Sequence, residues 1–94
     1  MQKYIVSTYK RIDNGEEGVT YQLLMREAAF RTFEGAENLA LAMANYDGAL
    51  RAFAKVADGF AIVIHDGNSP VEVIEYDGRL FRWYGDEIAE QFFE

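Results

Sequence analysis

The chain has 94 residues, a net charge of −7 and no cysteine, and half of its residues are hydrophobic. This length predicts one domain spanning residues 1–94, and the lack of cysteine excludes disulfides, thiolate metal ligands and thiol nucleophiles. No run of residues approaches the roughly 20 apolar positions needed to cross a membrane, and the start lacks a signal-peptide pattern. We therefore expect a cytoplasmic protein without membrane association.

The first third of the sequence predicts a β-hairpin. Residues 3–12 alternate loosely between polar and apolar side chains and are rich in Tyr, Ile, Val and Thr, which favours a strand. A polar turn with two glycines follows at 13–18, and 19–25 predicts the partner strand. Residues 26–31 fit either an extension of that strand or a turn before the next element.

A helical period governs residues 32–58. The pattern changes phase at Asp47-Gly48, which predicts two short helices or one kinked helix. Thr32 and Asp47 are the expected N-caps of the two parts. The core-facing residues of the first part recur at the i, i+3, i+4, i+7 spacing and are Phe33, Ala36, Leu39, Ala40, Met43 and Tyr46.

Three further strands are predicted after the helical stretch. Residues 60–64 are continuously apolar, which is typical of a central strand that is covered on both faces. Residues 71–76 and 79–84 flank Asp77-Gly78, a dipeptide that favours the two-residue type I′ turn of a β-hairpin.

Residues 85–94 predict a short terminal helix whose inner face carries Ile88, Ala89, Phe92 and Phe93. The complete order is then β-β-α-α-β-β-β-α, and strands joined by short turns pair antiparallel. The predicted fold class is α+β, an antiparallel sheet of about five strands with helices packed on one face.

The sequence contains no recognisable catalytic or metal-binding motif. His65 is the single histidine, and its neighbour Asp66 points to the other face of a strand, so Asp66 does not orient it for catalysis. Residues 66–69 lack the ligand spacing of a calcium loop, and phosphate-binding glycine motifs are absent. We interpret His65 as structural and expect no enzyme activity, no cofactor and no metal.

Tyr9-Lys10-Arg11 could stack on and pair with nucleic acid, as basic and aromatic residues on sheets do. The net charge of −7 opposes such binding, so direct nucleic-acid binding is not expected. We interpret this stretch as an edge strand that is protected by its charges.

The negative charge is concentrated in the second part of the chain. Residues 1–56 carry seven basic and seven acidic groups, whereas residues 57–94 carry two basic and nine acidic groups. This asymmetry indicates a basic partner, either a protein or a nucleoprotein complex. The expected partner-binding residues are Glu72, Glu75, Asp77, Asp86, Glu87, Glu90 and Glu94.

In size, charge and predicted fold class the chain resembles small acidic phage-encoded inhibitors, such as anti-CRISPR and anti-restriction proteins. The resemblance implies a non-enzymatic inhibitor whose carboxylates mimic nucleic-acid phosphates on a partner. One alternative is an assembly subunit or homodimer that associates through Leu24, Leu41, the Phe81/Trp83 strand face or the Leu80/Tyr84 face. A second alternative is a small enzyme that uses His65.

Overall fold

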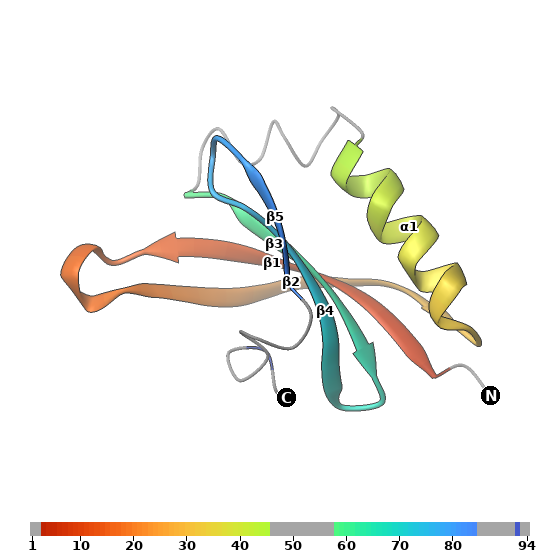
Figure 1. The fold of residues 1–94 in the computed structure, drawn as a ribbon. Helices are drawn as coiled ribbons and strands as arrows, with labels where there is room; N and C mark the ends of the chain where they lie inside the picture. The colour runs from red at the N-terminus through yellow and green to blue at the C-terminus, as the bar shows by residue number, and fades with distance from the viewer. Residues whose placement is uncertain (1–2, 46–57, 85–91, 93–94) are drawn as a thin grey trace.

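The computed structural model describes residues 3–45, 58–84 and 92. Five strands form one antiparallel sheet in the order β2-β1-β3-β4-β5, and α1 lies on one side of it (Figure 1). The elements are β1 (Tyr4–Asp13), the 3₁₀ turn η1 (Gly15–Glu17), β2 (Val19–Phe30), α1 (Phe33–Asn45), β3 (Phe60–Asp66), β4 (Ser69–Tyr76) and β5 (Phe81–Tyr84).

The predicted five-stranded antiparallel sheet is confirmed, and the helical part is confirmed only for α1. The helix expected after Asp47 lies outside the described residues, as does the terminal helix apart from Phe92. The ambiguous residues 26–31 belong largely to β2, which continues to Phe30.

β3 is the middle strand and is buried on both faces, as its continuous apolar run predicted. Its even-numbered residues, including Ile62 and Ile64, pack in a core with α1, while Ala61 and Val63 pack on the opposite face with Phe92. Each face of β3 therefore needs an apolar side chain, which explains why the run has no polar alternation.

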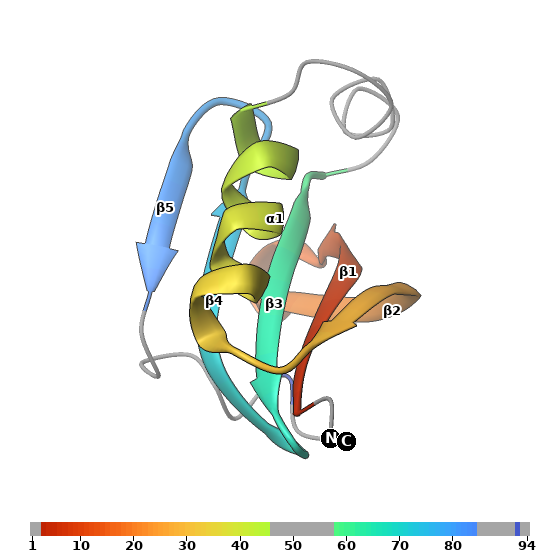
Figure 2. The same cartoon turned by 90° about the vertical axis from the view of Figure 1, so that its right-hand side faces the viewer.

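α1 covers the sheet with a stripe of small residues. Ala36, Ala40 and Ala44 are buried against the strands, so the helix lies close to the middle of the sheet, at β1 and β3 (Figure 2). Thr32 is the N-cap, as predicted, because its Oγ1 accepts a hydrogen bond of 3.1 Å from the Gly35 amide. In the described part of the chain no helix is both long and apolar enough to span a membrane.

β1 is an internal strand, so its interpretation as a charge-protected edge is wrong. It pairs with β2 on one side and with β3 on the other. The edge strand on this side of the sheet is β2, and its pairing with β1 slips twice, leaving Leu24 and Glu27 as the extra residues of two bulges. Bulges on an outer strand disturb the regular ladder that another chain would need for edge pairing.

The turn between β4 and β5 differs from the predicted type I′ turn. Tyr76 pairs with Phe81, so four residues rather than two connect the strands. A type I′ turn also needs positive φ at both central residues, whereas Gly78 has φ +95 and Asp77 does not have positive φ. The Asp77 carboxylate accepts hydrogen bonds from the Arg79 and Leu80 amides, which stabilises the longer turn instead.

Candidate functional site

The expected partner-binding carboxylates do not form one surface among the described residues. Glu72 and Glu75 are both buried, and they project to opposite faces of β4 because they pair with Ile64 and Ala61 of β3, which line different cores. Asp77 lies in the turn after β4. The other four expected residues, Asp86, Glu87, Glu90 and Glu94, lie outside the described part of the chain.

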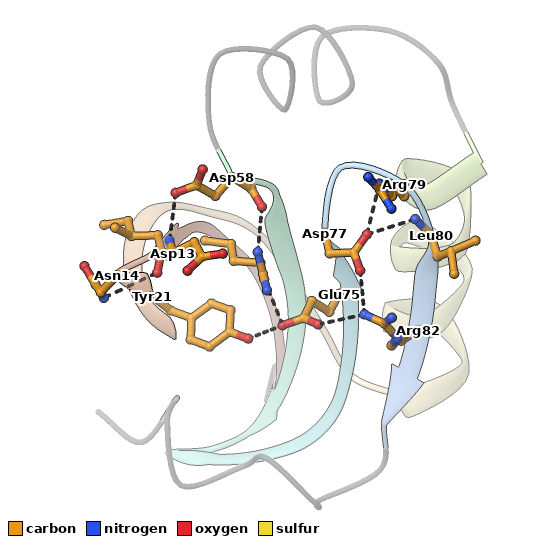
Figure 3. A network of polar contacts seen from close by, with 11 residues as sticks. Asp13, Asn14, Tyr21, Asp58, Glu75, Asp77, Arg79, Leu80 and Arg82 are labelled. Atoms are coloured by element: carbon orange, nitrogen blue, oxygen red, sulfur yellow. Dashed lines mark hydrogen bonds and ion pairs between the residues drawn. The ribbon is translucent and has the colours of Figure 1, made fainter. Parts of the chain in front are cut away.

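Glu75 is the centre of an internal polar network on the face opposite α1 (Figure 3). Its Oε2 accepts a hydrogen bond from the Tyr21 hydroxyl and lies 3.5 Å from Nε of Arg11. Its Oε1 lies 4.0 Å from Nη1 of Arg82. This carboxylate is therefore neutralised inside the protein, and its structural contacts leave little of it for a partner.

Asp77 is also engaged within the chain. Its Oδ2 accepts a hydrogen bond of 2.6 Å from Nη1 of Arg82, and its Oδ1 accepts from the Leu80 and Arg79 amides. The amide of Leu80 first, then that of Arg79, lower the pKa of Asp77 to about 2. The sequence does not reveal these contacts of Asp77, because they depend on the geometry of the four-residue turn between β4 and β5.

Glu72 has no cationic partner among the described residues. None of the ion pairs between described residues includes it, and its buried Oε2 has no hydrogen-bond partner. It faces a second carboxyl group, Glu37 of α1, and the indole of Trp83 on β5. Burial, followed by the hydrogen bond and charge of Glu37, raises the pKa of Glu72 to about 7.

The structure gathers a second group of carboxylates that sequence analysis did not single out. At the end of the β1–β2 hairpin, the amide of Asp13 donates a 2.7 Å hydrogen bond to Oδ2 of Asp58 (Figure 3). Glu16 and Glu17 follow in η1, and all four residues are exposed. We call Asp13, Glu16, Glu17 and Asp58 the acidic hairpin end. Sequence separation concealed it, because Asp58 is 45 residues from Asp13.

The basic and histidine candidates have structural roles. Tyr9 is buried, and Arg11 pairs with Glu75 and also donates a 2.9 Å hydrogen bond to the Asp58 carbonyl. His65 is buried, and its Nε2 donates a 2.9 Å hydrogen bond to the carbonyl of Phe92. Asp66 pairs with Lys3 at 3.3 Å. These contacts favour the structural interpretation of each residue over a catalytic or nucleic-acid-binding one.

Several large apolar side chains are exposed, including three of those proposed for an apolar interface. Leu24 is 43% exposed at a bulge of β2, beside Met25 at 54%. Leu80 and Trp83 are 60% and 48% exposed, and they lie at the other edge of the sheet, just before β5 and within it. These groups are separated by the width of the sheet, so they form two small patches and not one continuous surface.

Comparison with known proteins gives no further guidance on the site, because no family model, curated protein or solved structure matches this chain. Among residues 3–45, 58–84 and 92, no group of three or more His, Asp and Glu side chains is arranged to hold a metal ion.

Proposed function

We propose that this protein is a non-enzymatic binding domain that docks an acidic surface on a basic protein or nucleoprotein complex. The partner's lysine and arginine side chains would be of the kind that hold nucleic-acid phosphates, so that nucleic acid competes for the same surface. The binding would inhibit the partner by phosphate mimicry.

The observation that supports the proposal is the acidic hairpin end. Its four carboxylates are exposed, and none takes part in an ion pair between described residues. Two of them are held in place by the backbone, since Asp13 Oδ1 accepts from the Gly15 amide and Asp58 Oδ2 from the Asp13 amide. Fixed carboxylates of one sign attract a basic surface and speed its association.

A charge variant and a matched control test the proposal. Glu16→Gln with Glu17→Gln removes two exposed charges from the acidic hairpin end. Glu27→Gln with Glu34→Gln removes two exposed charges elsewhere, one on β2 and one in the first turn of α1. Immobilised wild-type protein should retain partners from lysate at about 50 mM salt and release them by about 500 mM, because salt screens such contacts.

The proposal requires that duplex nucleic acid displaces the captured proteins and that only the hairpin-end variant weakens their capture. A third variant, with Glu87, Glu90 and Glu94 changed to Gln, tests the C-terminal carboxylates that the sequence predicted as partner-binding. Capture that is unaffected by both acidic variants, or indifferent to salt over this range, would disprove electrostatic docking.

The exposed apolar residues support a second candidate, an assembly subunit. Leu24 and Met25 on the edge strand, or Leu80 and Trp83 at the other edge, would then carry the contact. Binding through such residues is insensitive to salt, so the same elution experiment separates the two candidates.

A further inference from the structure

Trp83 stands half exposed beside two carboxyl groups on the face of the sheet that α1 covers. It pairs with Ile74 of β4, whose side chain belongs to the core beneath α1, so the indole lies on this face. Glu72 precedes Ile74 by two residues on the same face of β4, so it is a diagonal neighbour of Trp83, and 48% of Trp83 is exposed. A large part of this aromatic surface is therefore free to contact a ligand. Figure 2 shows α1 drawn in front of β4, with β5 to the left of the helix.

No cation among the described residues forms an ion pair with either of the two carboxyl groups at this place. Glu72 is 9% exposed, its Oε2 is buried without a hydrogen-bond partner, and Glu37 of α1 faces it. On the other side β3 contributes Ile64, which cannot ionise. Two neighbouring carboxyl groups in partly dry surroundings repel one another when both are ionised, and a cation would relieve that repulsion.

We propose that Glu37, Glu72 and Trp83 form a binding site for one arginine side chain of the partner. The inference rests on the proposed function, because it identifies one contact by which an acidic domain recognises a basic protein. A guanidinium group is planar, donates several hydrogen bonds in a fork and stacks on aromatic rings, so it matches two carboxylates beside an indole. The ammonium group of lysine is more strongly hydrated and lacks the planar face.

Protonation should control this site. At pH 5.5 Glu72 carries a proton, because its pKa is raised to about 7, and the shared proton takes the place of the cation. At pH 8 Glu72 is ionised, and its charge adds to the attraction for the arginine. Within the part of the chain that the structure describes, Glu37 from α1 and Trp83 from β5 influence Glu72, and its partner on β3 is the non-ionisable Ile64. Binding should therefore be tighter at pH 8 than at pH 5.5.

The fluorescence of Trp83, the only tryptophan of the chain, reports binding directly. N-acetyl-arginine amide is titrated at pH 8, with N-acetyl-citrulline amide as the neutral isostere and N-acetyl-lysine amide as the second cation. We expect a saturable change with arginine, with a dissociation constant on the order of 1–10 mM, since one side chain supplies all the contacts. Lysine should bind more weakly, and citrulline should produce no saturable change.

Charge variants then assign the site. Glu72→Gln and Glu37→Gln should each weaken arginine binding by about tenfold or more, because each removes one charge-assisted pair. Glu34→Gln, three residues from Glu37 on the same helix and exposed, should leave the titration unchanged. Thermal unfolding of each variant confirms its fold, and Glu37→Gln tests the site independently if Glu72→Gln does not fold.

Three results would overturn the inference: no saturable response to arginine in the folded wild type, equal responses to arginine and citrulline, or unaltered binding in both folded Gln variants. The carboxyl pair would then only share a proton. The outcome is separable from that of the proposed function, because Glu16→Gln with Glu17→Gln should reduce capture of the partner without altering the arginine titration.

Discussion

The hydroxyl of Tyr21 on β2 donates a hydrogen bond to the carboxylate of Glu75 on β4, although β1 and β3 lie between these two strands. Arg11 on β1 completes the contact from the strand adjacent to β2. The network therefore ties the outer strand to the far half of the sheet across the face opposite α1. Desolvation of the phenol, followed by its bond to Glu75, raises the pKa of Tyr21.

Tyr21→Phe should destabilise the protein by about 1–2 kcal/mol, because the buried Glu75 loses a donor while the ring contact with Phe92 remains. Urea denaturation measures the change. Tyr76→Phe is the matched control, since the Tyr76 ring packs on Phe60 and no hydrogen bond of its hydroxyl occurs between described residues. The control should shift stability by less than about 0.5 kcal/mol, and equal losses in both variants would contradict the bridging role.

Glu72 should make stability depend on pH. Its folded pKa of about 7 exceeds the ordinary 4.5, so the folded state binds the extra proton and stability falls as pH rises between these values. We expect the free energy of unfolding of the wild type to fall by about 1–2 kcal/mol between pH 5 and pH 8. This is less than the whole pKa shift corresponds to, because solvent at the partly exposed Glu37 screens the interaction. In Glu72→Gln this loss should be absent, whereas Glu34→Gln should retain it; identical slopes in all three proteins would refute the assignment.

Gly59 should not accept a side chain. A Cβ atom there would lie 1.9 Å from the backbone oxygen of Tyr76, and the residue has φ +121. Gly59→Ala should therefore destabilise the fold by about 3 kcal/mol or more, through strain and forced movement of the backbone. Gly67→Ala, at φ +63 with open space around it, isolates the conformational part and should cost about 1 kcal/mol. Chemical denaturation compares the two, and similar costs would mean that the close contact is not rigid.

Asp77→Ala should weaken the β4–β5 turn by about 1 kcal/mol, since the Arg79 and Leu80 amides lose their acceptor. Asp77→Asn retains an acceptor oxygen and serves as the control. The pKa of Asp77 is lowered from 3.8 to about 2, so its contribution is present above pH 3.8 and is lost as pH falls through 2. Denaturation at pH 6 and at about pH 2 should show the gap between wild type and Asp77→Ala narrowing; a constant gap would argue against this carboxylate as the cause.

Amide hydrogen exchange should be slowest across residues 60–64 and fast around η1. β3 is hydrogen-bonded on both sides and its residues 60–64 are buried, whereas η1 contains no buried residue. Exchange monitored by NMR provides the test. Rapid exchange across residues 60–64 would mean that the centre of the sheet opens easily.

The sequence by itself determined the strand pattern and the position of α1. The apolar run of β3, the cap at Thr32 and the spacing of Ala36 and Ala40 are local signals, because each follows from the period of a strand or helix. The order of strands was not encoded in this way. The Tyr9-Lys10-Arg11 stretch resembled an edge, but β1 is internal because β3 returns to pair with it from a distance along the chain.

Only the tertiary structure decided which carboxylates are free. Composition showed an acidic second half, yet Glu75 and Asp77 are neutralised by arginines, Glu72 faces Glu37, and Asp58 joins the hairpin of the charge-balanced first part. The physical reason is that the charge environment of a side chain depends on distances in space and on burial. Pairing across strands sets these distances, and sequence separation does not.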